Sequence, residues 1–161
     1  MNTKRQEGFS LIELLIVVAI IGIIAAIAIP NLLASRRAAN EGSAQSSIRT
    51  LHSSEAVYQS TKGNGNFGTL GDLKTVELVD TLLGSANVAP GKSGYLFSCT
   101  PDNTATPVNF YCEAHPANVA ALTRTGHRSF TITETGVLRA KVSDTAPTDW
   151  ADAGSWSPMG Q

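Results

Sequence analysis

The chain has 161 residues, of which 42% are hydrophobic and 16% are charged, and its formal net charge is −1. These values exclude a polybasic tail for nucleic acid and an acidic disordered tail, and two cysteines cannot build a disulfide-rich miniature scaffold. The averages conceal an uneven distribution, because 18 of the 21 residues in 9–29 are hydrophobic. The sequence therefore predicts an apolar N-terminal segment joined to a more polar domain.

Residues 9–29 predict a membrane-spanning helix. A helix of this length covers roughly 32 Å, enough to cross a hydrocarbon core of about 30 Å. Lys4 and Arg5 precede the segment and no basic residue follows before Arg36, so the N-terminus is expected to stay cytoplasmic. Three interpretations are open: a conventional secretory signal cleaved near the small residues 26–28, a plain membrane anchor, and a leader that is removed from a retained helix.

The start of the apolar segment carries a more specific pattern. Residues 4–13 read KRQEGFSLIE: a short charged leader ends in Gly8, Phe9 begins the apolar helix, and Glu13 follows four residues later. This pattern resembles the class III signal of type IV prepilins. The resemblance implies that a prepilin peptidase cleaves between Gly8 and Phe9 and removes residues 1–8. It also implies N-methylation of Phe9 by a prepilin N-methyltransferase and retention of the apolar helix.

Glu13 lies inside the apolar segment, where a carboxylate is costly and a partner is expected. Cleavage would give Phe9 an α-amine that is largely cationic at pH 7. In a membrane or a filament core, this amine in one subunit could meet Glu13 of its neighbour and set the axial register of the stacked helices. The resemblance assigns Phe9 and Glu13 this assembly role. The alternative is that Glu13 reaches toward the membrane interface.

Pro30 follows the apolar segment, and Gly22 lies within it. Proline lacks the amide hydrogen and its ring clashes with the preceding turn. We therefore expect a kink or local melting between Gly22 and Pro30. Pilins carry glycine and proline at comparable positions.

Residues 31–60 continue the helix as an amphipathic half, so one long helix is expected over 9–60. One apolar stripe follows helical spacing and is expected to face the core: Ala44, Ile48, Leu51 and Tyr58. Charged residues are expected on the wetter faces: Arg36, Arg37, Glu41, Arg49 and Glu55.

Residues 61–161 predict a globular head of the α+β class. A short helix begins near Thr69, and the region before the strands corresponds to the αβ-loop of pilins. Strands are expected at 94–99, 108–113, 128–133 and 137–142, the last two joined by a turn at 134–136. The resemblance implies the type IV pilin fold, a long N-terminal helix packed on a small antiparallel sheet of three or four strands. Arg124, His127 and Arg128 are expected on a solvated edge.

Cys99 and Cys112 fall on neighbouring predicted strands. An exported head permits a disulfide between them, which would close a loop of about 14 residues and contribute about 3 kcal/mol; two free buried thiols are the alternative. Asp144, Asp149 and Asp152 in the tail offer oxygen ligands of the kind that calcium takes, but their spacing fits no EF-hand loop. No metal and no cofactor are predicted.

The chain is not expected to be an enzyme. Its three histidines are scattered, and it has neither C-x-x-C, nor G-x-S-x-G, nor a phosphate-binding loop. We expect a major subunit of a type IV pilus, a homopolymer built from the inner membrane by the pilus assembly machinery into an extracellular filament for adhesion, twitching motility or DNA uptake. The alternative is a pseudopilin or minor pilin of a type II secretion or competence system. A membrane-anchored monomeric binding module is the option from another class, and no specific nucleic-acid partner is predicted.

Overall fold

The computed structural model describes residues 9–160. It divides into two compact units, Met1–Ser35 and Arg36–Gln161, which are described separately. The helix α1, Leu11–Thr61, begins in the first unit and ends in the second. The expected leader, residues 1–8, and with it Gly8, lies outside the described residues.

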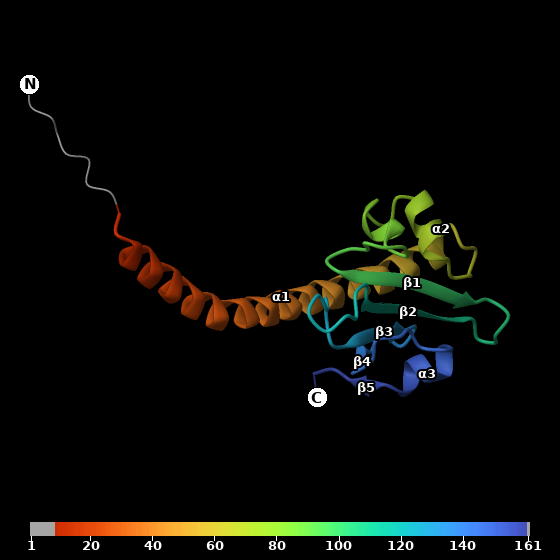
Figure 1. Cartoon of the computed structure of the whole chain (residues 1–161). Helices are drawn as coiled ribbons and strands as arrows, with labels where there is room; N and C mark the ends of the chain where they lie inside the picture. The colour runs from red at the N-terminus through yellow and green to blue at the C-terminus, as the bar shows by residue number, and fades with distance from the viewer. Residues whose placement is uncertain (1–8, 161) are drawn as a thin grey trace, which may run out of the picture. The chain divides into compact units, whose positions relative to one another are not determined.

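The first unit consists of the N-terminal part of α1 (Figure 1). The helix is continuous through Gly22 and Pro30, so the described chain contains no melted segment between these residues. Melting of this segment in a filament remains a prediction.

The second unit contains a five-stranded antiparallel sheet in the order β1-β2-β3-β4-β5. Its strands are β1 Tyr95–Asp102, β2 Asn109–Pro116, β3 Ser129–Thr133, β4 Arg139–Lys141 and β5 Ser157–Pro158. The expected α+β fold, with a long helix on an antiparallel sheet, is confirmed, but the sheet has five strands instead of the expected three or four. The additional strand β5 is two residues long and pairs with β4, which is too short for an alternating pattern to predict.

Three short helical segments complete the head. They are α2 Leu70–Thr75, the 3-10 turn η1 Leu83–Ser85 and α3 Trp150–Ser155. At the start of α2, the Thr69 hydroxyl accepts a hydrogen bond from the Asp72 amide while the Asp72 carboxylate accepts one from the Thr69 amide. This reciprocal capping satisfies amides that the first helical turn leaves unpaired.

The core of the head lies between α1, α2 and one face of the sheet. Ala44, Ile48 and Leu51 are fully buried and Tyr58 packs partly buried against them, so the apolar stripe predicted for α1 is confirmed. The largest side chains that the sheet contributes are Tyr95, Phe97, Phe110, Phe130 and Ile132.

Two of the charged residues expected on solvent-exposed faces of α1 are buried instead. Glu41 is 8% exposed and Glu55 is 0% exposed. The expectation failed because helical spacing gives the apolar stripe but not its width, and the head covers more of α1 than the apolar residues mark.

Candidate assembly site

Glu13 caps the N-terminus of α1. The backbone amide of Ser10 donates a hydrogen bond to Glu13 Oε2 at 2.9 Å. Glu13 thus lies in the first helical turn, where a negative charge also interacts favourably with the helix dipole. The spacing S-x-x-E is the sequence signature of a capping box, a signal that the sequence interpretation missed. The Glu13 Oε1 atom accepts no hydrogen bond within the described part of the chain.

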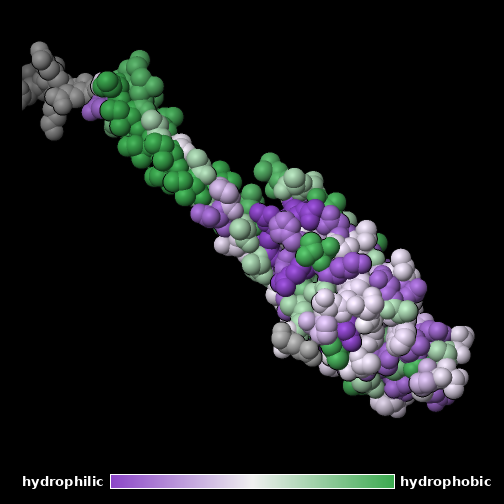
Figure 2. Space-filling model, turned by 90° about the horizontal axis from the view of Figure 1, so that it is seen from below, coloured by the Kyte–Doolittle hydropathy of each residue, from purple (hydrophilic) through white to green (hydrophobic). Residues whose placement is uncertain are grey.

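The N-terminal unit exposes a long apolar surface. Its helix is long and apolar enough to cross a membrane, and the most apolar part of the helix is not buried. Figure 2 shows this surface as the green segment at the N-terminal end of the described residues. Phe9 is 89% exposed and Leu11 is 76% exposed. A surface of this kind is stable only when lipid or other apolar helices cover it.

The surface offers space for close approach at Gly22. No heavy atom lies within 4 Å of the position that a Cβ atom of Gly22 would occupy, within the described chain. The glycine is therefore not required by contacts of its own chain. A small residue at such a position allows a neighbouring helix to come near the backbone.

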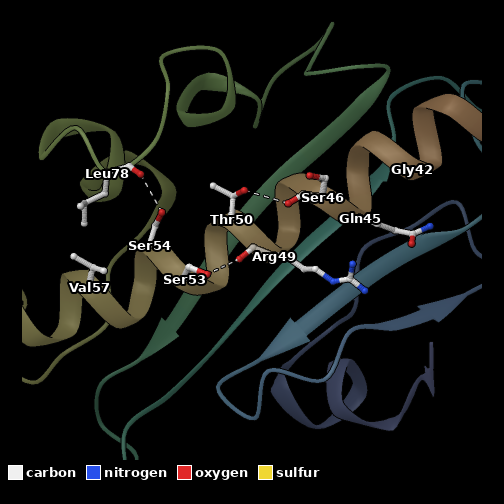
Figure 3. Close-up of a pocket in the computed structure, with 9 residues that line it drawn as sticks. All are labelled: Gly42, Gln45, Ser46, Arg49, Thr50, Ser53, Ser54, Val57 and Leu78. Carbon is white, nitrogen blue, oxygen red and sulfur yellow. Dashed lines mark hydrogen bonds between the residues drawn. The ribbon is translucent and has the colours of Figure 1, made fainter. Parts of the chain in front are cut away.

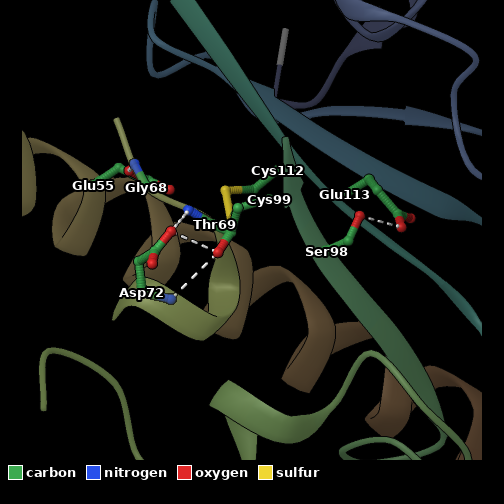
Figure 4. Close-up of a disulfide and its surroundings, with 8 residues drawn as sticks. All are labelled: Glu55, Gly68, Thr69, Asp72, Ser98, Cys99, Cys112 and Glu113. Atoms are coloured by element: carbon green, nitrogen blue, oxygen red, sulfur yellow. Dashed lines mark hydrogen bonds between the residues drawn. A yellow bond between two sulfur atoms is a disulfide. The ribbon is translucent and has the colours of Figure 1, made fainter. Parts of the chain in front are cut away.

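In the head, the predicted pairing of Cys99 with Cys112 is confirmed. The two residues face each other across β1 and β2 and form a disulfide. The bond crosslinks the two strands next to α1, as Figure 4 shows.

Glu55 lies beside the disulfide. One of its carboxylate oxygens lies within 4.8 Å of both sulfur atoms. Oε2 accepts a hydrogen bond from the Gly68 amide at 3.0 Å, whereas Oε1 is buried with no hydrogen-bond partner in the described structure. Burial raises the pKa of Glu55 from 4.5 to about 7; the Gly68 hydrogen bond opposes this rise and the charge of Asp72 adds to it.

Glu41 anchors α1 to the segment that leads into β3. Its Oε1 accepts a hydrogen bond from the His127 amide at 2.9 Å, and its Oε2 accepts one from Arg128 Nε at 2.8 Å. The His127 ring is in turn within 2.8 Å of the Arg37 guanidinium.

Arg124 forms two hydrogen bonds with Asp144, at 2.7 and 2.8 Å. The expected solvated cluster at 124–128 is thus a set of paired side chains, two of which bind α1.

The exposed face of α1 in the head carries mostly small polar side chains. Figure 3 shows them along an open groove that runs from Gly42 to Val57. Ser54 donates to the Leu78 carbonyl at 3.0 Å and so links α1 to the segment after α2. Thr50 donates to a carbonyl one turn back in the same helix. This face therefore presents few long side chains to a neighbour.

The acidic tail residues have separate structural roles. Asp144 pairs with Arg124, Asp149 caps α3 by accepting from the Asp152 amide, and Asp152 accepts from Trp156 Nε1 at 3.1 Å. Among the described residues, Glu55, Cys99 and Cys112 are the one group of three potential metal ligands that converge. Because the two cysteines are joined in a disulfide, they offer no thiolates to a metal.

The comparisons with known proteins concentrate on the N-terminal segment. Residues 3–29 match the family model of the prokaryotic N-terminal methylation motif. The type IV major pilin protein PilA of Myxococcus xanthus is 45% identical over 58 residues, which are 36% of this chain and 26% of that protein. The type IV wide pilus major component PilA4 of Thermus thermophilus is 46% identical over 56 residues, 35% of this chain and 43% of that protein.

A third relative matches over a longer region. The type II secretion system core protein G of Aeromonas hydrophila is 30% identical over 95 residues, which are 59% of this chain and 62% of that protein. The matches cover less than two thirds of each of these three relatives. No solved structure gives a significant match.

The methylation motif, the exposed apolar helix and the disulfide-bonded head on an antiparallel sheet agree with these likenesses. They indicate a structural subunit rather than an enzyme. By these features the N-terminal segment is that of a type IV pilin-like prepilin, and the chain is similar to both pilins and pseudopilins.

Proposed function

We propose that this chain is a structural subunit that polymerises through its apolar N-terminal helix into a type IV pilus. The single observation that carries the proposal is the exposed apolar surface of α1, which lies within the segment that matches the methylation motif. Lipid of the inner membrane covers this surface in the precursor. Neighbouring copies of the helix cover it in the filament, with Gly22 at a position of close approach.

In this proposal, the α-amine of Phe9 in one subunit forms an ion pair with Glu13 of a neighbouring subunit. Cleavage after Gly8 by the prepilin peptidase frees the Phe9 amine, which becomes methylated. Glu13 Oε2 caps the amide of Ser10, which leaves Oε1 for the amine of a neighbouring subunit. Pairing the two charges offsets the cost of removing each from water and fixes the axial register.

N-terminal sequencing of material sheared from the cell surface tests the processing step. The expected result is a chain that begins with N-methyl-Phe9. An intact Met1, or a start near Ile29 as after conventional signal cleavage, would contradict the proposal.

Two substitutions at Glu13 separate charge pairing from helix capping. Glu13→Gln keeps a carbonyl oxygen that can cap the Ser10 amide but has no charge, whereas Glu13→Ala loses both. If the charge sets the register, both variants lose filaments, as counted by electron microscopy. Normal filament yield from Glu13→Gln would show that capping is the only role of Glu13. Glu77→Gln, at an exposed carboxylate of the head, serves as the matched control.

A pseudopilin of a type II secretion system is the second candidate. It is favoured by the longer match to the Aeromonas hydrophila core protein G, which extends over 95 residues where the two pilins match over 58 and 56. Electron microscopy of cells that express the chain at its native level distinguishes the two. Abundant long surface fibres support the pilus, and short filaments confined to the periplasm support the pseudopilin.

A further inference from the structure

A groove of about 430 Å³ opens on the side of the sheet that faces away from α1. It is lined by residues of β1 and β2 and by the segment that begins α3. Tyr111 lies opposite Thr100, and Asn109 lies opposite Asp102, in the register of β1 and β2. Because side chains alternate along a strand, these four point away from the core that holds the disulfide.

Two aromatic side chains line the groove. Tyr111 is half-buried in the middle of β2, and Trp150 is 40% exposed at the start of α3. The Trp150 indole donates a hydrogen bond to Glu134 Oε2 at 2.8 Å, which fixes the orientation of its ring. An exposed aromatic ring held in place provides a flat apolar surface at low entropic cost on binding.

The polar side chains of the groove are also held in place. Asp102 Oδ1 accepts hydrogen bonds from the amide and the hydroxyl of Thr104, at 3.0 and 2.6 Å, and these bonds lower the pKa of Asp102. Asp149 Oδ1 accepts from the Asp152 amide at 2.8 Å. Each carboxylate retains a second oxygen that can accept a hydrogen bond from a ligand.

Asn109 lies beside these carboxylates and has an amide oxygen that makes no hydrogen bond in the described structure. Its Oδ1 atom is buried and has no donor within the part of the chain that the structure describes. Because this oxygen is unpaired, turning the amide toward a donor in the groove breaks no hydrogen bond at this oxygen. Such a turn would also remove the cost of leaving a buried acceptor unpaired. The groove thus combines two flat apolar rings with acceptors and an amide that can also donate.

The charge of the groove limits its ligands. Two carboxylates and no basic side chain line it, so an anionic ligand is repelled. Within the described residues, Asp102 and Asp149 are joined by no third His, Cys, Asp or Glu that would complete a metal site. The volume lies in the range of small-molecule sites, about 300–1,000 Å³.

We propose that this groove binds a neutral saccharide of one or two pyranose rings. The apolar C–H face of a pyranose stacks on Tyr111 or Trp150, and its hydroxyls donate to Asp102 and Asp149. Asn109 bonds a further hydroxyl as donor or acceptor. Hydrogen bonds from hydroxyls to ionised carboxylates are stronger than those between neutral groups. The proposal does not depend on filament formation, because every residue of the site belongs to the head.

Tryptophan fluorescence of the full-length chain provides the test. The chain is kept in a zwitterionic detergent without sugar groups, and a panel of neutral probes is titrated: methyl glucoside, methyl galactoside, methyl mannoside, N-acetylglucosamine and maltose. Trp150 is the reporter, and Trp156, which is 4% exposed, contributes a constant background. We expect a saturable change in emission with at least one probe at millimolar concentration.

Two substitutions that leave the reporter in place test the assignment. Tyr111→Ala removes a stacking surface, and Asp102→Asn removes a charged acceptor with little change in shape; each is expected to weaken binding about tenfold. Glu77→Gln, which removes an exposed carboxylate outside the groove, is expected to bind as the wild type does. Because Asp102→Asn preserves the side-chain size, it remains informative if Tyr111→Ala fails to fold.

Three results would overturn the proposal. The first is the absence of a saturable change with any probe, and the second is equal binding by the wild type and both groove variants. The third is a response to calcium chloride or to a cationic probe such as spermidine in place of the neutral sugars.

Discussion

The substitution Glu55→Gln tests how burial governs the stability of the head. Glu55 is fully buried and its Oε1 has no hydrogen-bond partner in the described structure. Burial raises its pKa from 4.5 to about 7. Because a pKa difference of one corresponds to about 1.4 kcal/mol, ionised Glu55 destabilises the folded state by about 3 kcal/mol.

The sign of the pH dependence follows from the two pKa values. Well below pH 4.5 the carboxyl is neutral in both states, so its ionisation does not affect stability. Between pH 4.5 and about 7 the unfolded chain releases the proton while the folded chain retains it, so the free energy of unfolding falls as the pH rises. Above pH 7 Glu55 is charged in both states, and the full cost remains.

Glu55→Gln removes this ionisation but keeps a carbonyl oxygen that can accept from the Gly68 amide. The variant is expected to match the wild type at pH 4 and to exceed it by up to about 3 kcal/mol at pH 8. His115, whose pKa is raised by its hydrogen bond to Glu113, also lowers stability as the pH rises. It does so in both proteins, so the difference between them isolates Glu55.

Urea unfolding of the full-length chain in detergent, followed by near-UV circular dichroism from pH 4 to pH 8, measures this difference. Glu77→Gln is the control, because it removes an exposed carboxylate and should leave the pH profile unchanged. Parallel profiles of the wild type and Glu55→Gln would refute the reasoning, as would a loss of stability in the variant at pH 8.

Three further predictions concern the packing of the head, all measured by urea unfolding. Replacing Cys99 and Cys112 together by serine removes the crosslink and should cost about 3 kcal/mol; an unchanged midpoint under non-reducing conditions would contradict this. Glu41→Gln weakens the pair with Arg128, which is 40% exposed, and should lower the free energy of unfolding by only about 1 kcal/mol. A variant whose head does not fold would contradict this prediction. Ile48→Ala empties a fully buried position and should cost about 3 kcal/mol, whereas a cost below that of Glu41→Gln would show that the core rearranges.

The features that could be predicted from the sequence are those encoded locally. The leader pattern, the apolar segment and the stripe of α1 each depend on residues within a few turns of one another. Cys99 and Cys112 could be paired because two short alternating strands put them side by side. The capping contact of Ser10 with Glu13 is equally local, and its S-x-x-E spacing is a signal that the sequence also carries.

The features that could not be predicted arise where distant segments meet. The two-residue strand β5 exists because the tail returns to β4, and no periodic pattern can signal two residues. The groove beside α3 joins Tyr111 of one strand to Trp150, which is 39 residues away in the sequence. Its members become neighbours only through the register of the sheet and the position of α3.

Three glutamates of α1 show why residue type alone does not predict a role. Glu41 is buried, pairs with Arg128 and stabilises the contact of the helix with the segment that leads into β3. Glu55 is buried without a counter-charge and resists ionisation. Glu13 is exposed in an apolar segment, and its Oε2 caps the amide of Ser10. In water all three would be equivalent carboxylates; the surroundings of each one decide whether it holds the head together, resists ionisation, or stays exposed for the assembly role that we propose for Glu13.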